Sequence, residues 1–452
     1  MHTVATVGIC TLGCRVNQYE SQAIAEELTA HGLIVRPFSE VCDVYIVNTC
    51  SVTAESGRKS RQMVRRAHTQ NPDAAIFVTG CEAQRAPEAL CAIEGVRYLC
   101  GNREKSGIVR AVLACLRNES VPSHEALSLQ DAPFDSMRIT SSTHTRAFVK
   151  IEDGCNGKCA YCIIPTLRGG VRSKPMEDVL AEVAGLAANG YREVVLTGIE
   201  TSAYEYDLAE LMAQVAKISG IARIRLGSLN PATLRPAFAE KIARIPQVMP
   251  HFHLSVQHGC NSVLHRMRRG YSVEQLQSGV QNLRRLMPQV QFSADIIVGF
   301  PGETDAEFEA SYQVLQEIGF LHLHLFPYSI RPGTEAATMP NQIPESVKSE
   351  RLKRLEALDV RSRRASIAPY LTPQAPALPV LFETFADGEA VGHTHHFMEV
   401  HVPSDVSLQG QILPVRLTGY TDGGVRGVLE SALPKTENGT QKNRNQSKES
   451  EE

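Results

Sequence analysis

Three cysteines lie close together in the motif Cys155-x-x-x-Cys159-x-x-Cys162, within the run KIEDGCNGKCAYCIIP. A cubane iron–sulfur cluster takes one ligand on each of its four irons, usually a cysteine thiolate. Three thiolates in one loop leave one iron open, where a small molecule can bind and react. Zinc is the alternative metal, but it favours four ligands in paired C-x2-C modules, and no second pair with this spacing occurs. The spacing therefore favours a [4Fe–4S] cluster at these cysteines.

A second set of three cysteines is spread over the first part of the chain. Cys14, Cys50 and Cys81 each end a similar phrase, TLGC, VNTC and VTGC, just past a predicted strand. In an open parallel sheet, ligands collect outside the carboxyl ends of the strands, so the three thiols can meet at one point. The spacing alone nevertheless favours three unrelated buried thiols, which is a common fate of free cysteine.

The chain of 452 residues alternates short apolar runs with helical patterns, which is typical of an α/β protein. We predict five regions: an open α/β domain (1–118), a linker (119–143), a partial parallel (βα)6 barrel with a charged helix (144–372), a small β-barrel (373–432) and a disordered tail (433–452). The partial-barrel strands are expected in RAFVKI, EVVLTGI, RIRLGSL, HFHLSVQ, SADIIVGF and HLHLFPYS. Cys155 follows the first of these strands, at the end of the barrel where active sites lie.

The motif around Cys155 resembles the radical S-adenosylmethionine (SAM) superfamily, in which SAM chelates the open iron through its amino and carboxylate groups. Tyr161, just before the last cysteine, is part of that pattern. The phrases TLGCRVNQYES, NTCSVT and VTGCEAQ resemble the three signatures of the methylthiotransferase N-terminal domain. This resemblance covers nearly the whole chain, including a TRAM-like C-terminal barrel. It implies that Cys14, Cys50 and Cys81 hold a second [4Fe–4S] cluster.

The phrase TLGCRVN is most similar to the family branch that converts N6-threonylcarbamoyladenosine, just 3′ of the tRNA anticodon, to its 2-methylthio form. Three alternatives stay open: a methylthiotransferase acting on isopentenyladenosine in tRNA, a radical SAM enzyme with an auxiliary cluster acting on a peptide, and a non-catalytic RNA-binding iron–sulfur protein.

Four residues depart from the usual pattern of this family, namely Glu200, Asn230, His258 and Cys260. The cysteines interpreted as structural are Cys10, Cys42, Cys91, Cys100, Cys115 and Cys260.

Adenine C2–H carries no acidic proton, so acid–base residues cannot functionalise it and a radical route is expected, in which cofactors carry the chemistry. The resemblance implies that the reduced first cluster splits SAM into methionine and a 5′-deoxyadenosyl radical that abstracts hydrogen. It also implies that the second cluster presents a sulfur that another SAM has methylated. An external electron donor and a sulfur donor are then required. No catalytic side chain is predicted beyond the cluster ligands.

Further SAM contacts are predicted at the ends of the barrel strands. The candidates are Thr197, Gly198, Ser228 and Asp295, together with Tyr161 of the cysteine motif. Ordinary loop capping is the alternative role for the strand-end residues.

The net charge of −3 gives no global sign of nucleic-acid binding, so RNA contacts must come from local basic clusters. Three such clusters are predicted to bind a tRNA anticodon stem-loop: Arg58, Arg61 and Arg65; Arg168 and Arg172; and Arg266, Arg268 and Arg269. Taken singly, each arginine is more typical of a solvated face. The threonylcarbamoyl group ends in a carboxylate, which favours an arginine partner. Arg15 and Arg168 are the candidates for this partner.

The composition predicts the compartment. Twelve cysteines in a chain of this size do not form a disulfide scaffold, and thiolate ligands fit a reducing cytosol. No run of about 18 apolar residues occurs, so no membrane span is expected. The N-terminal apolar stretch is short and no Lys or Arg precedes it, so a signal peptide is not expected. We therefore predict a cytoplasmic protein with no membrane partner.

Overall fold

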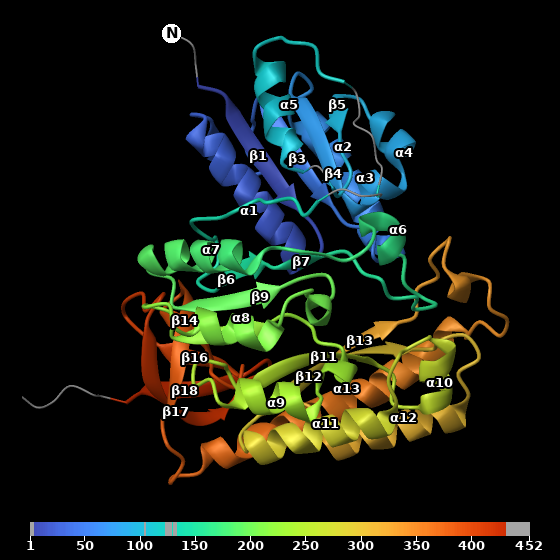
Figure 1. Ribbon diagram of the computed structural model, residues 1–452, viewed down its shortest axis with the longest axis vertical. Helices are drawn as coiled ribbons and strands as arrows, with labels where there is room; N and C mark the ends of the chain where they lie inside the picture. The colour runs from blue at the N-terminus through green and yellow to red at the C-terminus, as the bar shows by residue number, and fades with distance from the viewer. Residues whose placement is uncertain (1–3, 104, 123–128, 130–132, 431–452) are drawn as a thin grey trace, which may run out of the picture.

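The computed structural model describes residues 4–103, 105–122, 129 and 133–430. Its N-terminal part, blue in Figure 1, is a parallel sheet in the order β2-β1-β3-β4-β5 with helices packed around it. The strands are β1 (Thr6–Thr11), β2 (Ile34–Arg36), β3 (Val44–Thr49), β4 (Ala75–Gly80) and β5 (Val96–Leu99); the helices are α1 (Arg15–Ala30), α2 (Ala54–Gln70), α3 (Cys81–Arg85), α4 (Pro87–Cys91) and α5 (Gly107–Leu116). The four predicted strands are confirmed, and β2 is an additional short strand of three exposed residues.

Six parallel strands form the central half-barrel, in two three-stranded sheets that isolated bridges at Ile224 and Leu229 join. They are β6 (Ala147–Lys150), β9 (Glu193–Thr197), β10 (Arg223–Leu226), β11 (His251–Gln257), β12 (Gln291–Val298) and β13 (His322–Pro327). Between them lie α6 (Ile164–Arg168), α7 (Met176–Ala188), α8 (Leu208–Val215), α9 (Pro236–Ala243), α10 (Asn261–Arg266), α11 (Val273–Leu286) and α12 (Asp305–Ile318), the short strands β7 (Glu152–Asp153) and β8 (Arg172–Ser173), and the 3-10 turns η1 (Thr201–Ala203) and η2 (Pro231–Thr233). The predicted partial barrel and the α/β class are confirmed.

The chain then runs through η3 (Glu335–Ala337), the long helix α13 (Glu345–Ile367) and η4 (Ala368–Leu371) into a closed C-terminal barrel, ordered β14-β15-β16-β18-β17. The barrel strands are β14 (Leu378–Ala386), β15 (Glu389–Thr394), β16 (Glu399–Pro403), β17 (Ile412–Tyr420) and β18 (Val425–Leu429). This barrel, red in Figure 1, packs beside the half-barrel. Arg223 and Arg225 of β10 donate to backbone carbonyls of β14 and β15, which fixes the contact. The predicted tail and parts of the predicted linker lie outside the described residues.

A buried ionic cluster joins the N-terminal sheet domain to the half-barrel. Glu20 of α1 pairs with Lys105, Lys150 and Arg168, and Arg168 also pairs with Asp153. Burial disfavours the charged form of Glu20, but the three cations outweigh it and hold its pKa well below the usual range. Removing one member would leave a buried charge unpaired, so the cluster fixes how the two domains face each other. Among the described residues, no helix is long and apolar enough to cross a membrane.

Candidate functional site

The loop that carries Cys155, Cys159 and Cys162 follows β7, and backbone amides near the cysteines donate hydrogen bonds to two of the three sulfurs. The sulfur of Cys155 accepts from the Gly157 amide at 3.2 Å, and that of Cys162 accepts from the Ile164 amide at 3.4 Å. Arg269, from the far side, donates to the Cys159 sulfur at 3.4 Å. Each of the three sulfurs therefore has one N–H donor, which is the outer support that thiolate ligands of a cluster use.

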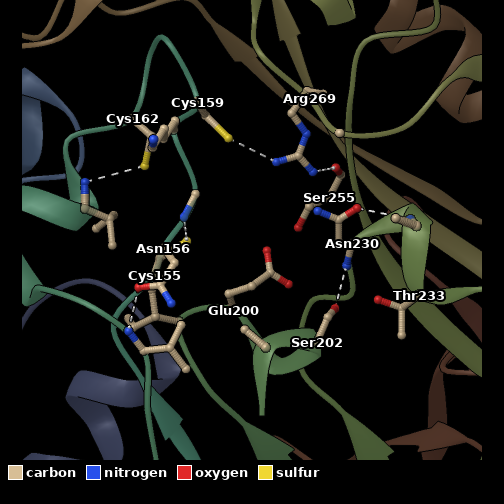
Figure 2. A pocket seen from close by; sticks show the side chains of 18 of the residues that line it. Cys155, Asn156, Cys159, Cys162, Glu200, Ser202, Asn230, Thr233, Ser255 and Arg269 are labelled. Carbon is tan, nitrogen blue, oxygen red and sulfur yellow. Dashed lines mark hydrogen bonds between the residues drawn. The ribbon is translucent and has the colours of Figure 1, made fainter. Parts of the chain in front are cut away.

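A cavity of about 870 Å³ opens in front of these three cysteines; we call it the loop cavity. Figure 2 shows the cysteines on one side, Arg269, Ser255 and Asn230 on the other, and the Glu200 carboxylate between them. Glu200 and Asn230 both come from loops at the carboxyl ends of half-barrel strands, β9 and β10. The cavity is thus placed where a barrel of this kind collects its ligands.

Two acidic residues, Glu152 and Glu200, are hydrogen-bonded to each other at the edge of the loop cavity. Burial raises the pKa of Glu152 to about 9, so this carboxyl is neutral, and its Oε2 accepts from the Glu200 amide at 2.8 Å. The Oε1 atom of Glu200 is buried and has no hydrogen-bond partner among the described residues. A buried acceptor facing a cavity needs a donor. An amino group on a ligand bound at the cysteine loop satisfies that need, so the residues present fit SAM.

The second cysteine set lies at the carboxyl ends of three neighbouring parallel strands. Cys14 follows β1, Cys50 follows β3 and Cys81 follows β4, and these strands are adjacent in the sheet. A Cβ at Gly13 would lie 2.8 Å from the Cys50 sulfur, so the loop before Cys14 runs directly against Cys50. Burial raises the pKa of the Cys50 thiol, and the nearby Cys81 and Cys14 thiolates add to this rise. The three thiols that the sequence separates are therefore neighbours in space.

Two side chains tie the three cysteine loops together. The Asn17 amide donates to the carbonyl of Leu12 at 2.7 Å and to that of Thr49 at 3.0 Å, which links the loops of Cys14 and Cys50. The Thr49 hydroxyl accepts from the Glu82 and Ala83 amides at 3.1 and 3.2 Å, which links the loop of Cys50 to the start of α3. Cys81 is the first residue of that helix.

Both cysteine sets are compatible with a [4Fe–4S] cluster. No group of three or more His, Cys, Asp or Glu side chains within the described part of the chain is arranged to hold one metal ion. A [4Fe–4S] cluster takes one thiolate per iron, so its ligands stand farther apart than those of one ion. Asn102 adds a donor at 3.6 Å from the Cys81 sulfur. Three thiols at each site fit two such clusters.

A second cavity, of about 480 Å³, lies inside the half-barrel and reaches the N-terminal cysteine site at Cys14; we call it the barrel cavity. The residues predicted as SAM contacts at strand ends, Thr197, Gly198, Ser228 and Asp295, line this cavity. Tyr161 lines the loop cavity instead. Of the four residues that depart from the family pattern, Glu200 and Asn230 line the loop cavity, whereas His258 and Cys260 line neither cavity among the described residues.

The arginines predicted to bind RNA divide into exposed and partly or fully buried groups. Arg58 and Arg65 are exposed on α2, and Arg268 is exposed beside the loop cavity. Of these three, Arg58 pairs with Glu55 at 2.6 Å and Arg268 pairs with Glu335 at 2.7 Å. Arg61 is partly buried against Glu82, and Arg266 is paired with Glu307 at 2.8 Å.

Arg168 requires correction as an RNA ligand, whereas Arg172 and Arg269 stay predictions. Arg168 is fully buried in the ionic cluster, so it reaches neither RNA nor a substrate carboxylate. Arg172 is partly buried and donates to the Arg168 carbonyl at 3.1 Å. Arg269 supports Cys159 from within the loop cavity. A charge pattern along the sequence does not report which acids will fold against these cations.

Comparisons with known proteins agree with this geometry. A model of the Radical SAM superfamily matches residues 149–315, and a model of the uncharacterized protein family UPF0004 matches residues 6–101. The radical SAM methyltransferase TsrM from Kitasatospora setae, with cobalamin and a [4Fe–4S] cluster bound, aligns with a TM-score of 0.59 at 15% identity, over 74% of this chain and 77% of that chain. The fold and the cysteine loop thus define a radical SAM enzyme.

Relatives that share sequence extend over nearly the full length. The threonylcarbamoyladenosine tRNA methylthiotransferase MtaB of Bacillus subtilis (strain 168) is 37% identical, over 95% of this chain and 98% of its own. The protein of the same name from Chlamydia pneumoniae is 38% identical, over 94% and 98%. The tRNA-2-methylthio-N(6)-dimethylallyladenosine synthase of Hahella chejuensis (strain KCTC 2396) is 31% identical, over 94% and 98%. The chain belongs to the radical SAM methylthiotransferase family, whose cofactors are SAM and two [4Fe–4S] clusters.

Proposed function

We propose that this protein is a tRNA methylthiotransferase that converts N6-threonylcarbamoyladenosine, just 3′ of the anticodon, to its 2-methylthio derivative. The observation that carries the proposal is the pairing of two three-cysteine sites across one cavity system, in a chain 37% identical over 95% of its length to a methylthiotransferase of that name. The tRNA anticodon stem-loop is the macromolecular substrate.

The cysteine loop and the N-terminal site have different roles in the proposed reaction. Cys155, Cys159 and Cys162 hold one cluster with SAM in the loop cavity, and Cys14, Cys50 and Cys81 hold the other. When bound, these groups supply a radical that removes the adenine C2 hydrogen and a methylated sulfur that replaces it. Arg269 supports the first set of thiolates, and Glu200 receives the amino group of SAM.

The barrel cavity is the place for the target base. Thr197 and Gly198 line the barrel cavity while Ile199 and Glu200, next along the chain, line the loop cavity, so the two cavities adjoin. A base in the barrel cavity therefore lies between the SAM site and Cys14. The aromatic ring of Phe148 faces this space and can stack on a base. An adenine in an anticodon loop is unstacked at low cost, which exposes its C2 position.

The reaction needs partners beyond RNA. We propose that an external electron donor reduces the clusters, that a separate sulfur donor restores the transferred sulfur, and that the protein works in the cytoplasm, where tRNA is modified. Exposed Arg58, Arg65 and Arg268 are the surface residues that we assign to phosphate contacts.

Mass spectrometry of tRNA nucleosides from cells with and without the gene tests the proposal. We expect the 2-methylthio form of threonylcarbamoyladenosine to disappear without the gene and its unthiolated precursor to accumulate. Loss of the 2-methylthio isopentenyl nucleoside instead would favour the sister substrate. An unchanged tRNA profile would favour a peptide substrate, or RNA binding without catalysis if the purified protein also forms no 5′-deoxyadenosine.

A further inference from the structure

The barrel cavity is built from one side chain of nearly every half-barrel strand and from the start of α1. Phe148, Thr197, His253, Asp295 and His324 come from β6, β9, β11, β12 and β13. Gly13, Cys14, Arg15 and Val16 close the cavity from the N-terminal domain. A ligand in this space would therefore touch the half-barrel and the residues next to a cluster cysteine at once.

Arg15 is the cation of this cavity that lacks a carboxylate partner. The neighbouring Arg146 pairs with Glu383 at 3.0 Å, and Arg225 pairs with Glu193 at 2.7 Å. Among the described residues, Arg15 makes no ion pair within 4.0 Å, and its guanidinium instead lies 5.6 Å from the centre of the Phe148 ring.

The acid that lines the cavity is already engaged. Asp295 is the carboxylate among the described lining residues, and the Nε2 atom of His253 lies 3.1 Å from it. The other ring nitrogen of His253 is hydrogen-bonded to the Ser293 hydroxyl at 2.8 Å, which holds the imidazole toward Asp295. The guanidinium of Arg15 is thus available to a ligand that carries its own negative charge.

We propose that Arg15 binds the terminal carboxylate of the threonylcarbamoyl group and is the residue that selects this substrate over an isopentenyl one. The inference rests on the proposed function. A guanidinium offers two parallel N–H donors to a carboxylate. An isopentenyl group carries no acceptor, so it would leave Arg15 buried and unpaired, which opposes its binding. Arg146 adds positive potential but has its own partner in Glu383.

The test measures binding of anticodon stem-loops to the reconstituted holoprotein. Three stem-loops differ at one group: threonylcarbamoyl, its carboxamide analogue without the negative charge, and isopentenyl. The wild-type protein is expected to bind the carboxylate about tenfold to a hundredfold tighter than the carboxamide, the usual contribution of a hydrogen-bonded charge. Arg15→Gln should lose that factor on the carboxylate and change carboxamide binding by less than about twofold. The control Arg285→Gln removes an exposed arginine of α11, outside both cavities, and should retain the full preference.

Each outcome separates the assignment of Arg15 from the wider function. Wild-type preference for the isopentenyl stem-loop would overturn the proposed substrate, whereas preference for threonylcarbamoyl that survives in Arg15→Gln would overturn only the role of Arg15. Because Arg15 follows a cluster cysteine, iron content is measured for each variant. Arg15→Lys keeps the positive charge but lacks the two parallel N–H donors of a guanidinium, so it should lose part of the preference for the carboxylate stem-loop. This variant replaces Arg15→Gln in the test if Arg15→Gln loses iron. Equal binding of carboxylate and carboxamide by the wild type would also contradict the assignment.

Discussion

The two cysteine sites of this protein are built in opposite ways. Cys155, Cys159 and Cys162 lie within eight residues of one loop, and backbone amides of that loop support two of the three sulfurs. Cys14, Cys50 and Cys81 come from the ends of three strands, so their spacing depends on the sheet and on the side chains that join the loops. A local site is therefore robust to distant changes, and a distributed site is sensitive to them.

The largest expected difference is in SAM cleavage. Replacing Cys155, Cys159 and Cys162 with Ala should lower reductive 5′-deoxyadenosine formation by more than about a hundredfold, because even changes outside the ligand shell cost up to that factor. Replacing Cys14, Cys50 and Cys81 should abolish thiomethyl transfer to tRNA while cleavage of SAM continues. Chromatography of both products from the same reaction separates these effects. Loss of SAM cleavage in both variants would contradict the prediction that only the Cys155, Cys159 and Cys162 site is needed for cleavage.

A single methyl group should damage the distributed site. Gly80 precedes Cys81 with φ +97°, and a Cβ there would lie 2.4 Å from the Thr49 carbonyl oxygen. Gly80→Ala should reduce iron from about eight to about four per chain and destabilise the fold by about 1–3 kcal/mol. The control Gly190→Ala has a similar φ of +89° with nothing within 4 Å, so it bears backbone strain alone. About eight irons per chain in Gly80→Ala would mean that the close packing of Gly80 against Thr49 is not required for the cluster at Cys81.

Removing a link between loops should have a smaller effect. Asn17→Ala deletes the amide that joins the Cys14 and Cys50 loops and leaves buried carbonyls without a donor, at about 1–3 kcal/mol. Iron at the N-terminal site should become labile to chelators, while iron at the cysteine loop stays. Asn71→Ala is the control, because its amide bonds the Cys42 carbonyl at 2.9 Å, away from both sites. Similar chelator kinetics in the two variants would contradict the linking role.

The smallest effect should come from the surface near the N-terminal site. Arg65 is exposed on α2, so Arg65→Gln should weaken tRNA binding severalfold and reduce the slope of log affinity against log salt by about one. The control Arg285→Gln lies on α11 and should leave the slope unchanged. Filter binding across a salt series gives both quantities. An equal slope for Arg65→Gln and the wild type would remove α2 from the RNA surface.

What the sequence predicts follows the same contrast. The motif of Cys155 is local, so its spacing alone indicates a cluster. Cys14, Cys50 and Cys81 are linked only through resemblance to a family, because convergence requires the order of strands in the sheet. The half-barrel strands are readable as apolar runs, whereas β2 has only three residues, all exposed, and is too short to be recognised in this way.

The positions of single polar side chains escape sequence analysis for a related reason. Thr197 and Glu200 stand three residues apart, yet one lines the barrel cavity and the other the loop cavity, because the chain turns between them. Arg168 has the same local charge pattern as a surface residue, but Glu20 lies 148 positions away and pairs with it only in the folded chain.

Iron content tests the central claim of two separate sites most directly. Anaerobically reconstituted wild-type protein should hold about eight irons per chain, because each cubane contains four. The Cys155/Cys159/Cys162→Ala and Cys14/Cys50/Cys81→Ala variants should each hold about four, and the six-cysteine variant close to none. About eight irons in the variant without Cys14, Cys50 and Cys81, or loss of all iron when either set is removed, would contradict two independent clusters.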